Sequence, residues 1–373
     1  MSKVKLKRFL TEYSVRNKSG KDYPVYSVTN SNGFCTEYFT KDVSSNDKTN
    51  YKIVPFGYFA YNPSRINVGS VDCQEVEENV IVSPLYNVFK CSDSLDRHYL
   101  KYFFKSRYGQ NLINANTSGS VRANLKFKTL CEFEISNRSL NEQKEAVEIF
   151  ENINNLIENE KHSLFLLDEL IKSRFNEMFS KIIYSGDRET NFGSICDGII
   201  GLTYKPDNIS DEGTIVLRSG NIQNNNLQII DDVVRVSNIN IPDEKMVRDL
   251  DILMCARNGS ARLVGKTCII RNPTEQMTFG AFMTIIRTKY PYILHHYMNS
   301  DFFRIQLKST QTASVNQITN GMLKEYSVFS PTDAEEKQFR SFVEQIDKLK
   351  FNVQKRIDYY QELLNKKMDE YFN

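Results

Sequence analysis

The sequence predicts a mixed α/β protein in which two α/β units alternate with two long antiparallel helices that form a coiled coil, as a pseudo-two-fold internal repeat. Nearly the same helix ending occurs twice, as ELIKSRFNEMF at residues 169–179 and as ELLNKKMDEYF at residues 362–372. Their offset is 362 − 169 = 193 residues, and at this offset LCEFEISNRSLNEQ from residue 130 lies over LKEYSVFSPTDAEE from residue 323. A constant register that ends at matched helix termini indicates two copies of one unit, each a globular part followed by a long helix.

The two helices are predicted at residues 139–185 and 332–373, where no Pro or Gly interrupts the chain. Apolar residues recur there at the 4-3 spacing of a coiled-coil seam. SLNEQ and TDAEE open the two segments with Ser or Thr three residues before Glu, the pattern of a capping box. Sister helices that pair antiparallel are the favoured arrangement, with packing on each helix's own globular part, or between chains, as alternatives. The residues assigned to helix pairing and subunit docking are Ile149, Ile153, Leu156, Leu167, Leu170, Phe342, Ile346, Leu349, Val353, Tyr360 and Leu363.

The globular segments, residues 1–138 and 186–331, have the mixed pattern of short strands and helices. ENVIVSPLYNVFKC and DLDILMCARNG are typical of strands, while residues 95–115 and 291–310 each predict one amphipathic helix.

Composition points to a soluble protein whose first globular segment is basic. Hydrophobic residues make up 40% of the chain and charged residues 25%, which is ordinary for a globular protein. Residues 1–140 contain 20 Lys and Arg against 13 Asp and Glu, a moderate excess that favours a polyanionic partner. No stretch has the length or apolarity of a membrane span or a signal peptide, so we expect a cytoplasmic protein without membrane contact.

The sequence contains none of the residue constellations that an enzyme of a common class would need. Its seven cysteines form no CxxC pair, so reduced buried thiols are expected rather than zinc or disulfides, and its four histidines have no HExxH context. No GxxxxGK[ST] loop is present, and no GxGxxG follows a strand. YNPSR at residues 61–65 resembles the loop of adenine methyltransferases only superficially, because it lacks the second proline and the aromatic residue. We therefore expect no metal and no catalytic residue.

Polar loops rich in Arg, Asn, Gln, Ser and Gly occur at matching places in both copies. They lie at residues 29–33, 62–70 and 117–128 in the first copy and at 217–226, 256–266 and 310–321 in the second. Arg forks bind guanine, Asn and Gln pair with adenine, and Ser, Thr and Lys suit phosphates. Any one such loop could be a solvated turn, but three per copy, aligned by the repeat, favour a shared ligand-binding face made of residue types that suit DNA. The candidate residues are Asn30, Asn32, Asn62, Arg65, Ser118, Arg122, Asn124, Lys126, Arg218, Asn221, Arg257, Asn258, Arg262, Lys266, Gln311 and Asn316.

With these features the chain resembles the specificity subunit of type I restriction–modification systems. GSVRANLKFKTLCEFEI and SVNQITNGMLKEYSVFSP look like the ends of the family's recognition modules, and the two repeated helix endings look like its helical regions. One departure is that ISNRSLNEQ lacks the proline-rich entry that often precedes these helices, which blurs the first module boundary.

The resemblance implies a non-catalytic DNA reader. Residues 1–138 and 186–331 would be two target recognition domains, and residues 139–185 and 332–373 two helical spacers. The implied partners are double-stranded DNA, two methyltransferase subunits and, where present, two restriction subunits. S-adenosylmethionine, ATP and Mg²⁺ would then be bound by those partners, with no cofactor in this chain. Two alternatives remain open: a fragment of a fused restriction–modification enzyme, and a coiled-coil interaction protein without a role on DNA.

Overall fold

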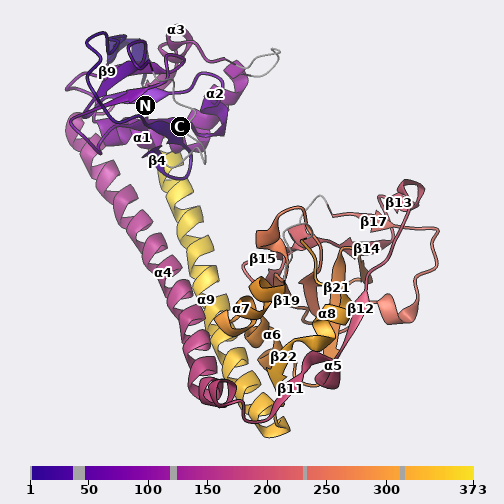
Figure 1. The fold of residues 1–373 in the computed structure, drawn as a ribbon. Helices are drawn as coiled ribbons and strands as arrows, with labels where there is room; N and C mark the ends of the chain where they lie inside the picture. Colours follow the sequence, from indigo (N-terminus) through magenta and orange to yellow (C-terminus); the bar gives the residue numbers. More distant parts are fainter. Residues whose placement is uncertain (1, 37–46, 118–123, 230–232, 311–315) are drawn as a thin grey trace. The chain divides into compact units, whose positions relative to one another are not determined.

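The computed structural model describes residues 2–36, 47–117, 124–229, 233–310 and 316–373 (Figure 1). It divides into two compact units. Unit 1 comprises Met1–Ser163 with Val353–Asn373, and unit 2 comprises Leu164–Asn352. The two long helices, α4 (Leu140–Ser185) and α9 (Asp333–Phe372), therefore each contribute to both units.

Unit 1 is built around a four-stranded antiparallel sheet in the order β2-β9-β6-β7. Its strands are β1 (Lys3–Lys5), β2 (Leu10–Glu12), β3 (Ser27–Thr29), β4 (Gly33–Cys35), β5 (Lys52–Pro55), β6 (Phe59–Tyr61), β7 (Val71–Cys73), β8 (Asn79–Val82), β9 (Asn87–Cys91) and β10 (Glu134–Ser136). Its shorter helices are α1 (Arg97–Lys105), α2 (Arg107–Thr117) and α3 (Phe127–Leu130). The β3–β4 hairpin and the β5–β8 and β1–β10 pairs complete the unit.

Unit 2 has a four-stranded antiparallel sheet with the corresponding order, β12-β21-β18-β19. Its strands are β11 (Glu189–Asn191), β12 (Cys196–Ile200), β13 (Ile209–Ser210), β14 (Thr214–Leu217), β15 (Ile222–Gln223), β16 (Asn226–Leu227), β17 (Arg235–Val236), β18 (Ile252–Cys255), β19 (Thr267–Ile269), β20 (Met277–Phe279), β21 (Met283–Thr288) and β22 (Ser327–Phe329). Its shorter helices are α5 (Phe192–Ile195), α6 (Pro291–Asn299), α7 (Asp301–Thr310) and α8 (Asn320–Glu325). A second sheet, β13-β17-β14-β20, is larger than its counterpart in unit 1.

The two copies share their order of elements, which confirms the internal repeat predicted from the sequence. In both four-stranded sheets the first strand along the chain pairs with the fourth, the fourth with the second and the second with the third. The β1–β10 pair corresponds to β11–β22, and the hairpin β3–β4 corresponds to β15–β16. Sequence similarity that is faint in the globular parts thus accompanies one topology.

The predicted single helices before each module end are two helices in both copies. Ser106 and Ser300 adopt extended backbone conformations and separate α1 from α2 and α6 from α7. The Ser106 hydroxyl accepts a hydrogen bond from the Gly109 N–H at 3.0 Å, so it starts α2 as a cap would. The prediction of one continuous helix per copy was wrong. A serine on the polar face of a helix pattern is compatible with a solvent-exposed helical position, whereas here each serine lies where one helix ends and the next begins.

Capping boxes begin both long helices, as predicted. The Ser139 N–H donates to the Glu142 carboxylate at 2.8 Å, and the Glu142 N–H donates back to the Ser139 hydroxyl at 3.3 Å. Thr332 and Glu335 repeat this arrangement at 2.8 and 3.2 Å. Each box satisfies backbone donors that the first turn of a helix leaves unpaired.

Within each unit, α4 and α9 pack antiparallel, because contacts at rising residue numbers on α4 fall at decreasing numbers on α9. The pairs in contact are Phe150 with Phe372 and Glu160 with Arg356 in unit 1, and Asp168 with Lys350 and Phe175 with Phe339 in unit 2. The sister helices therefore do pair within the chain.

The buried seam differs in register from the predicted one. Ile153, Ile346 and Val353 are buried as expected, and five predicted residues are half-buried: Ile149, Leu167, Phe342, Tyr360 and Leu363. Leu156, Leu170 and Leu349 are 43%, 46% and 50% exposed, so their assignment to helix pairing was wrong. Other apolar residues of the two helices, which were not predicted to lie in the seam, are buried: Phe150, Ile157, Ile171, Val343, Ile357 and Leu364. The helices turn to bury Phe150 against Phe372, because aromatic rings contribute the largest apolar area.

Candidate nucleic-acid interface

In unit 2, the three predicted polar loops meet through hydrogen bonds. The Asn258 side chain donates to the Ser219 hydroxyl at 3.3 Å, and its backbone N–H donates to the Asn316 carbonyl at 3.3 Å. The Asn316 side chain donates to the Gly259 carbonyl at 3.2 Å. Segments far apart in the sequence, around residues 219, 258 and 316, are thereby fixed in one surface.

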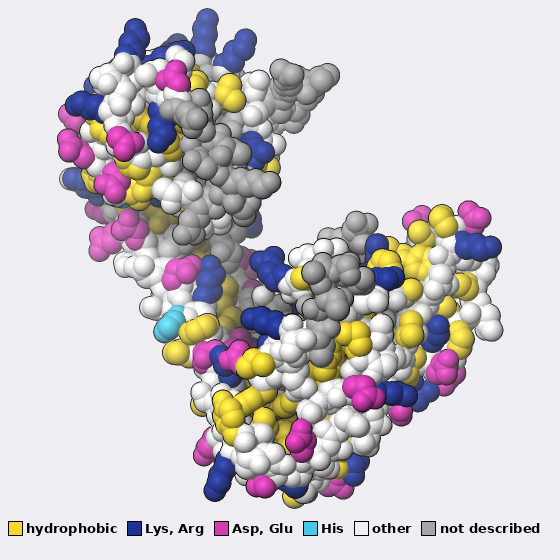
Figure 2. Space-filling view, viewed as in Figure 1, with side chains coloured by type: hydrophobic (Ala, Val, Ile, Leu, Met, Phe, Trp, Pro, Cys, Tyr) yellow, Lys and Arg dark blue, Asp and Glu magenta, His cyan; other side chains and the backbone are white. Residues whose placement is uncertain are grey.

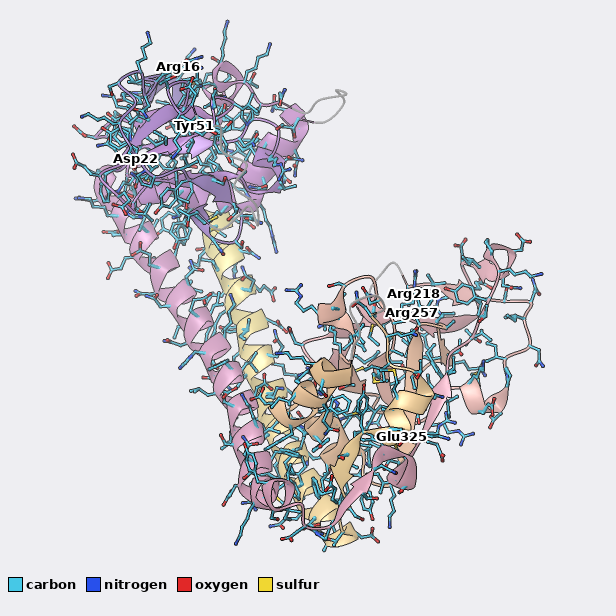
Figure 3. The ribbon with its side chains drawn as sticks, viewed as in Figure 1. Arg16, Asp22, Tyr51, Arg218, Arg257 and Glu325 are labelled. Carbon is cyan, nitrogen blue, oxygen red and sulfur yellow. The ribbon has the colours of Figure 1, made fainter. Side chains whose placement is uncertain are left out.

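Four cationic side chains lie on these loops: Arg218, Arg257, Arg262 and Lys266. The three arginines are exposed and Lys266 is half-buried. In the part of the chain that the structure describes, none of the four has a carboxylate oxygen within 4 Å of its charged nitrogens, although ion pairs are frequent elsewhere in the unit. Figure 3 labels Arg218 and Arg257 in the same region of unit 2, well away from Glu325. Unpaired cations of this kind are available to an external polyanion.

Asn221 has a structural role in this surface and is not free to contact a base. Its side chain is 4% exposed. Its oxygen accepts from the Arg218 N–H at 2.8 Å, and its amide nitrogen donates to the Gln228 carbonyl at 3.0 Å. The assignment of Asn221 to DNA binding is therefore corrected: it holds the loop that carries Arg218.

In unit 1, two predicted loops lie side by side. The Leu125 N–H donates to the Pro63 carbonyl at 3.0 Å, and the Tyr61 hydroxyl donates to the Leu125 carbonyl at 3.1 Å. Asn62 caps its own loop, because its oxygen accepts from the Ser64 N–H and hydroxyl at 3.1 and 2.9 Å. These bonds bring Asn62 and Arg65 next to the segment that contains Asn124 and Lys126. Asn62 is half-buried, and Arg65, Asn124 and Lys126 are exposed.

The β3–β4 hairpin of unit 1 adds the third loop. A β-carbon added at Gly69 would lie 2.3 Å from the Asn30 side-chain oxygen, so Asn30 packs directly against the loop after β6. Asn30 and Asn32 line a cleft of about 610 Å³ together with Lys101 and Lys105 of α1. Ser118, Arg122 and Gln311 lie outside the described residues.

Lys101 and Lys105 are residues that sequence reasoning missed. Lys101 forms an ion pair with Asp72 at 2.7 Å. Burial lowers the pKa of Lys105 below its usual value, and the neighbouring charge of Lys101 lowers it further. Both lie on a helix whose apolar periodicity predicted only packing, so no sequence signal singled them out. On the face seen in Figure 2, Lys and Arg side chains gather along the upper edge of unit 1.

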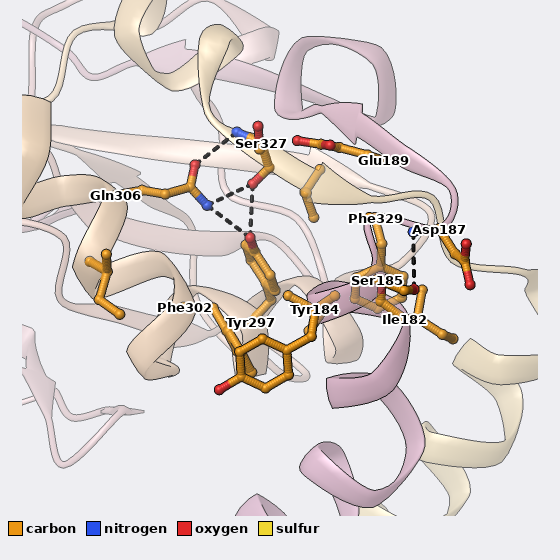
Figure 4. Close-up of a pocket in the computed structure, with 14 residues that line it drawn as sticks. Ile182, Tyr184, Ser185, Asp187, Glu189, Tyr297, Phe302, Gln306, Ser327 and Phe329 are labelled. Carbon is orange, nitrogen blue, oxygen red and sulfur yellow. Dashed lines mark hydrogen bonds between the residues drawn. The ribbon is translucent and has the colours of Figure 1, made fainter.

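The cavities of unit 2 away from these loops show no catalytic arrangement. One of about 530 Å³ follows the end of α4, where Gln306 donates to the Tyr297 hydroxyl and to the Ser327 carbonyl at 2.9 Å each (Figure 4). Gln306 also accepts from the Ser327 N–H at 2.8 Å, so its amide holds β22 against α7 and α6. The polar groups here bond to one another and serve the fold.

Titratable groups are shifted in directions that suit burial rather than catalysis. Burial lowers the pKa of His296 to about 4 and holds that of His295 well below its usual value, so both rings are neutral. Burial raises the pKa of Cys196 and Cys268 to about 12, which leaves unreactive thiols. Among the described residues, no group of three His, Cys, Asp or Glu side chains could hold a metal ion, and no helix is long and apolar enough to cross a membrane.

Comparison with known proteins extends these observations. Residues 3–167 match the model of the type I restriction modification DNA specificity domain. No curated protein sequence matches the chain. A solved structure described as the basis of complex assembly and conformational transition of a type I R-M system is 14% identical, with 99% of this chain and 96% of that chain covered at a TM-score of 0.55.

Two further solved structures are similar over the same extent. The type I restriction–modification S subunit from M. genitalium is 15% identical, with 100% of this chain and 96% of that chain covered at a TM-score of 0.49. The HsdS subunit from Thermoanaerobacter tengcongensis is 15% identical, with the same coverage at a TM-score of 0.40. Residues 3–167 are thus similar to the type I restriction modification DNA specificity domain, and the chain shares its fold with the solved structure of a type I R-M system.

Proposed function

We propose that this chain is a specificity subunit that reads a bipartite DNA target. Residues 1–138 and 186–331 act as target recognition domains, one for each half of the target. Residues 139–185 and 332–373 act as spacers that set the separation of the two halves and bind the partner subunits. Base pairs between the halves are not contacted, as in other proteins with two separated DNA-reading modules.

The observation that carries this proposal is the surface around Ser219, Asn258 and Asn316, where Arg218 and Arg257 form no ion pair with any described residue. Arg, Asn and Ser are the side chains that read base edges and hold phosphates. The loops of unit 1 around Asn62 and Asn124 offer the same chemistry from a different sequence. Two such surfaces on one chain would read two different half-sites, which gives an asymmetric target.

A second observation concerns exposed apolar residues on α4 and α9, and it supports the binding of two copies of one partner protein. Exposed apolar residues recur at the offset of the repeat: Leu156 corresponds to Leu349, and Leu166 corresponds to Tyr359. These side chains are 43%, 50%, 52% and 61% exposed, respectively. Apolar side chains of this size gain free energy when a partner covers them. Because the pair repeats, we propose that each helix binds one methyltransferase subunit through this surface.

In this proposal, the partner subunits catalyse DNA methylation and, where present, restriction. Two methyltransferase subunits would bind S-adenosylmethionine and methylate the target, and two restriction subunits, where present, would use ATP and Mg²⁺. This chain supplies no cofactor site to those reactions. A complex that reads cellular DNA in this way works in the cytoplasm.

A gel-shift titration tests the proposal. The full chain, co-expressed with its methyltransferase partner, should bind its target at least about 10³-fold more tightly than unrelated DNA at physiological salt. Arg218→Ala and Arg257→Ala should each weaken specific binding, whereas Arg174→Ala on α4, whose guanidinium already pairs with Glu177 at 2.7 Å, should not. Failure of the wild-type complex to distinguish any DNA sequence would refute the proposed function.

A further inference from the structure

The aromatic residue Phe282 lies next to the polar loop of unit 2 that carries Arg257. Phe282 lies between β20 and β21, and its side chain is 59% exposed. Leaving most of a phenyl ring in water forgoes the free energy that burial of this area would provide, on the order of 1 kcal/mol or more. Single exposed apolar residues are common, so the meaning of Phe282 depends on what it contacts.

Phe282 is bonded to the loop that carries Arg257. The backbone N–H groups of Ala256 and Arg257 both donate to the Phe282 carbonyl, at 3.0 Å each. On its other side, Arg257 forms a β-bridge with Gln317, and the Ile318 N–H donates to the Ala256 carbonyl at 2.7 Å. The backbone of Arg257 is therefore held from two directions by segments distant in sequence.

The side chains of the two residues also meet. The guanidinium carbon of Arg257 lies 5.7 Å from the centre of the Phe282 ring, within the range of a cation–π contact. Most other arginines over a ring in the described chain have a carboxylate partner as well, namely Arg97, Arg138, Arg174, Arg271 and Arg340. The exceptions are Arg8, which lies over its sequence neighbour Phe9, and Arg257. The ring therefore restricts the Arg257 side chain, while no described carboxylate pairs with its guanidinium.

Resting on the proposed function, we propose that Phe282 is a positioning residue that presents Arg257 to a guanine in the half-site read by unit 2. A guanidinium fork donates two hydrogen bonds to guanine O6 and N7 in the major groove, and the other three bases cannot accept both. Stacking on a ring restricts the rotamers of a long arginine, so less entropy is lost when the fork binds. Phosphate binding would need no such orientation.

The test uses the full chain with its methyltransferase partner and the target motif obtained from the wild-type complex. Each guanine of the second half-site is replaced in turn by 7-deazaguanine, which keeps base pairing and removes the N7 acceptor. At one position we expect the wild-type complex to bind about 10- to 100-fold more weakly, because the fork loses its hydrogen bond to N7 and keeps the one to O6, and a hydrogen bond to a charged group contributes about 1.5–3 kcal/mol. Arg257→Ala should bind both DNAs equally, Phe282→Ala should lose most of the difference, and Phe282→Tyr should restore it.

Phe56 in unit 1 provides the matched control. It is also exposed, and the Arg97 guanidinium carbon lies 5.3 Å from its ring, but Arg97 is paired with Glu75 at 2.9 Å. Phe56→Ala should leave the 7-deazaguanine effect in the second half-site unchanged. Thermal unfolding of each variant, together with binding through the first half-site, shows that the fold is retained.

The outcomes separate this inference from the proposed function. A wild-type complex with no specific target would refute both. A specific complex whose second half-site contains no guanine sensitive to the substitution, or whose sensitivity survives in Arg257→Ala, would overturn the role of Arg257. If Phe282→Ala lost as much affinity on 7-deazaguanine substitution as the wild type does, the role of Phe282 would be overturned and that of Arg257 would stand.

Discussion

Glu336 shows how one buried side chain joins the long helix α9 to the globular part of unit 2. It is 7% exposed, and its carboxylate accepts hydrogen bonds from the N–H groups of Tyr292 and Ile293 at 2.9 and 3.0 Å. Helix α6 has no capping side chain of its own at its first residue, so Glu336 of α9 supplies the missing acceptor. At the offset of the repeat stands Gln143, which accepts from the Asp96 N–H at 2.7 Å at the start of α1.

The neighbouring His296 predicts an acid sensitivity of unit 2. Its ring lies 5.0 Å from that of Phe339 on α9, and its Nδ1 lies 2.8 Å from the Tyr292 carbonyl. Burial lowers its pKa from 6.5 to about 4. Below pH 6.5 the unfolded chain takes up a proton that the folded chain does not, so stability present above that pH is lost as the pH falls towards 4. The shift corresponds to about 2 kcal/mol lost between pH 7.5 and pH 5.

Replacement by phenylalanine checks this prediction. His296→Phe keeps an aromatic ring, as Tyr102 does at the matching place in the first copy, and removes the titration. Urea unfolding at pH 7.5 and pH 5 should show a smaller loss of unfolding free energy in His296→Phe than in the wild type. An equal loss in both proteins would mean that His296 does not titrate between the folded and unfolded states.

At the scale of elements, the seam between α4 and α9 gives a matched pair of variants. Ile157 is 3% exposed and Leu156 is 43% exposed, one residue apart on the same helix. Ile157→Ala should lower the free energy of unfolding of unit 1 by about 2–4 kcal/mol, because it removes buried methyl groups and leaves a cavity. Leu156→Ala should cost less than about 1 kcal/mol.

Leu156→Ala, which should have the smaller effect on stability, should have the larger effect on binding of the partner subunit. Sedimentation of the complex should show that Leu156→Ala, stable by itself, binds the methyltransferase subunit more weakly. A destabilised but fully binding Leu156→Ala would place this residue in the helix seam and not in a docking surface.

The sequence predicted the existence, the ends and the caps of the long helices, because these depend on local chemistry. Absence of Pro and Gly and the pairs Ser139–Glu142 and Thr332–Glu335 are read within a few residues. The register of the seam was missed because α4 carries two apolar stripes one residue apart, through Leu156 and through Ile157. Which stripe is buried depends on the partner helix, where Phe372 packs on Phe150.

At the scale of the whole molecule, the repeat found in the sequence became a repeat of topology, and its loops formed a common surface in each unit. The loops could be predicted because Asn, Gly, Ser and Arg are concentrated there. The role of Asn221 inside its loop and the contact of Phe282 with Arg257 could not, since both depend on hydrogen bonds between distant segments. In the proposed function, the matched helix endings would bind identical partners, whereas the differing loops would bind two different half-sites.

The spacer role predicts an effect of helix length. Inserting one heptad after Ser163 in α4 and one after Asn352 in α9 places each insertion at the point of the helix where the chain passes from one unit to the other. Seven residues add about 10.5 Å of helix, equivalent to about three base pairs. Methylome sequencing should find both half-sites unchanged and the spacer between them longer by about this amount. Insertion in α4 alone, which breaks the pairing register, should abolish methylation, and an unchanged spacer in the double insertion would refute the spacer role.

The central claim, that two units of one chain read two separate half-sites, is tested most directly by methylome sequencing of cells that contain this chain and its methyltransferase partner, with wild type and Arg257→Ala compared. The wild type should give a bipartite motif with an unread spacer. Arg257→Ala should relax or change only the half read by unit 2 and leave the other half intact. A continuous motif, or a change confined to the other half, would contradict the account.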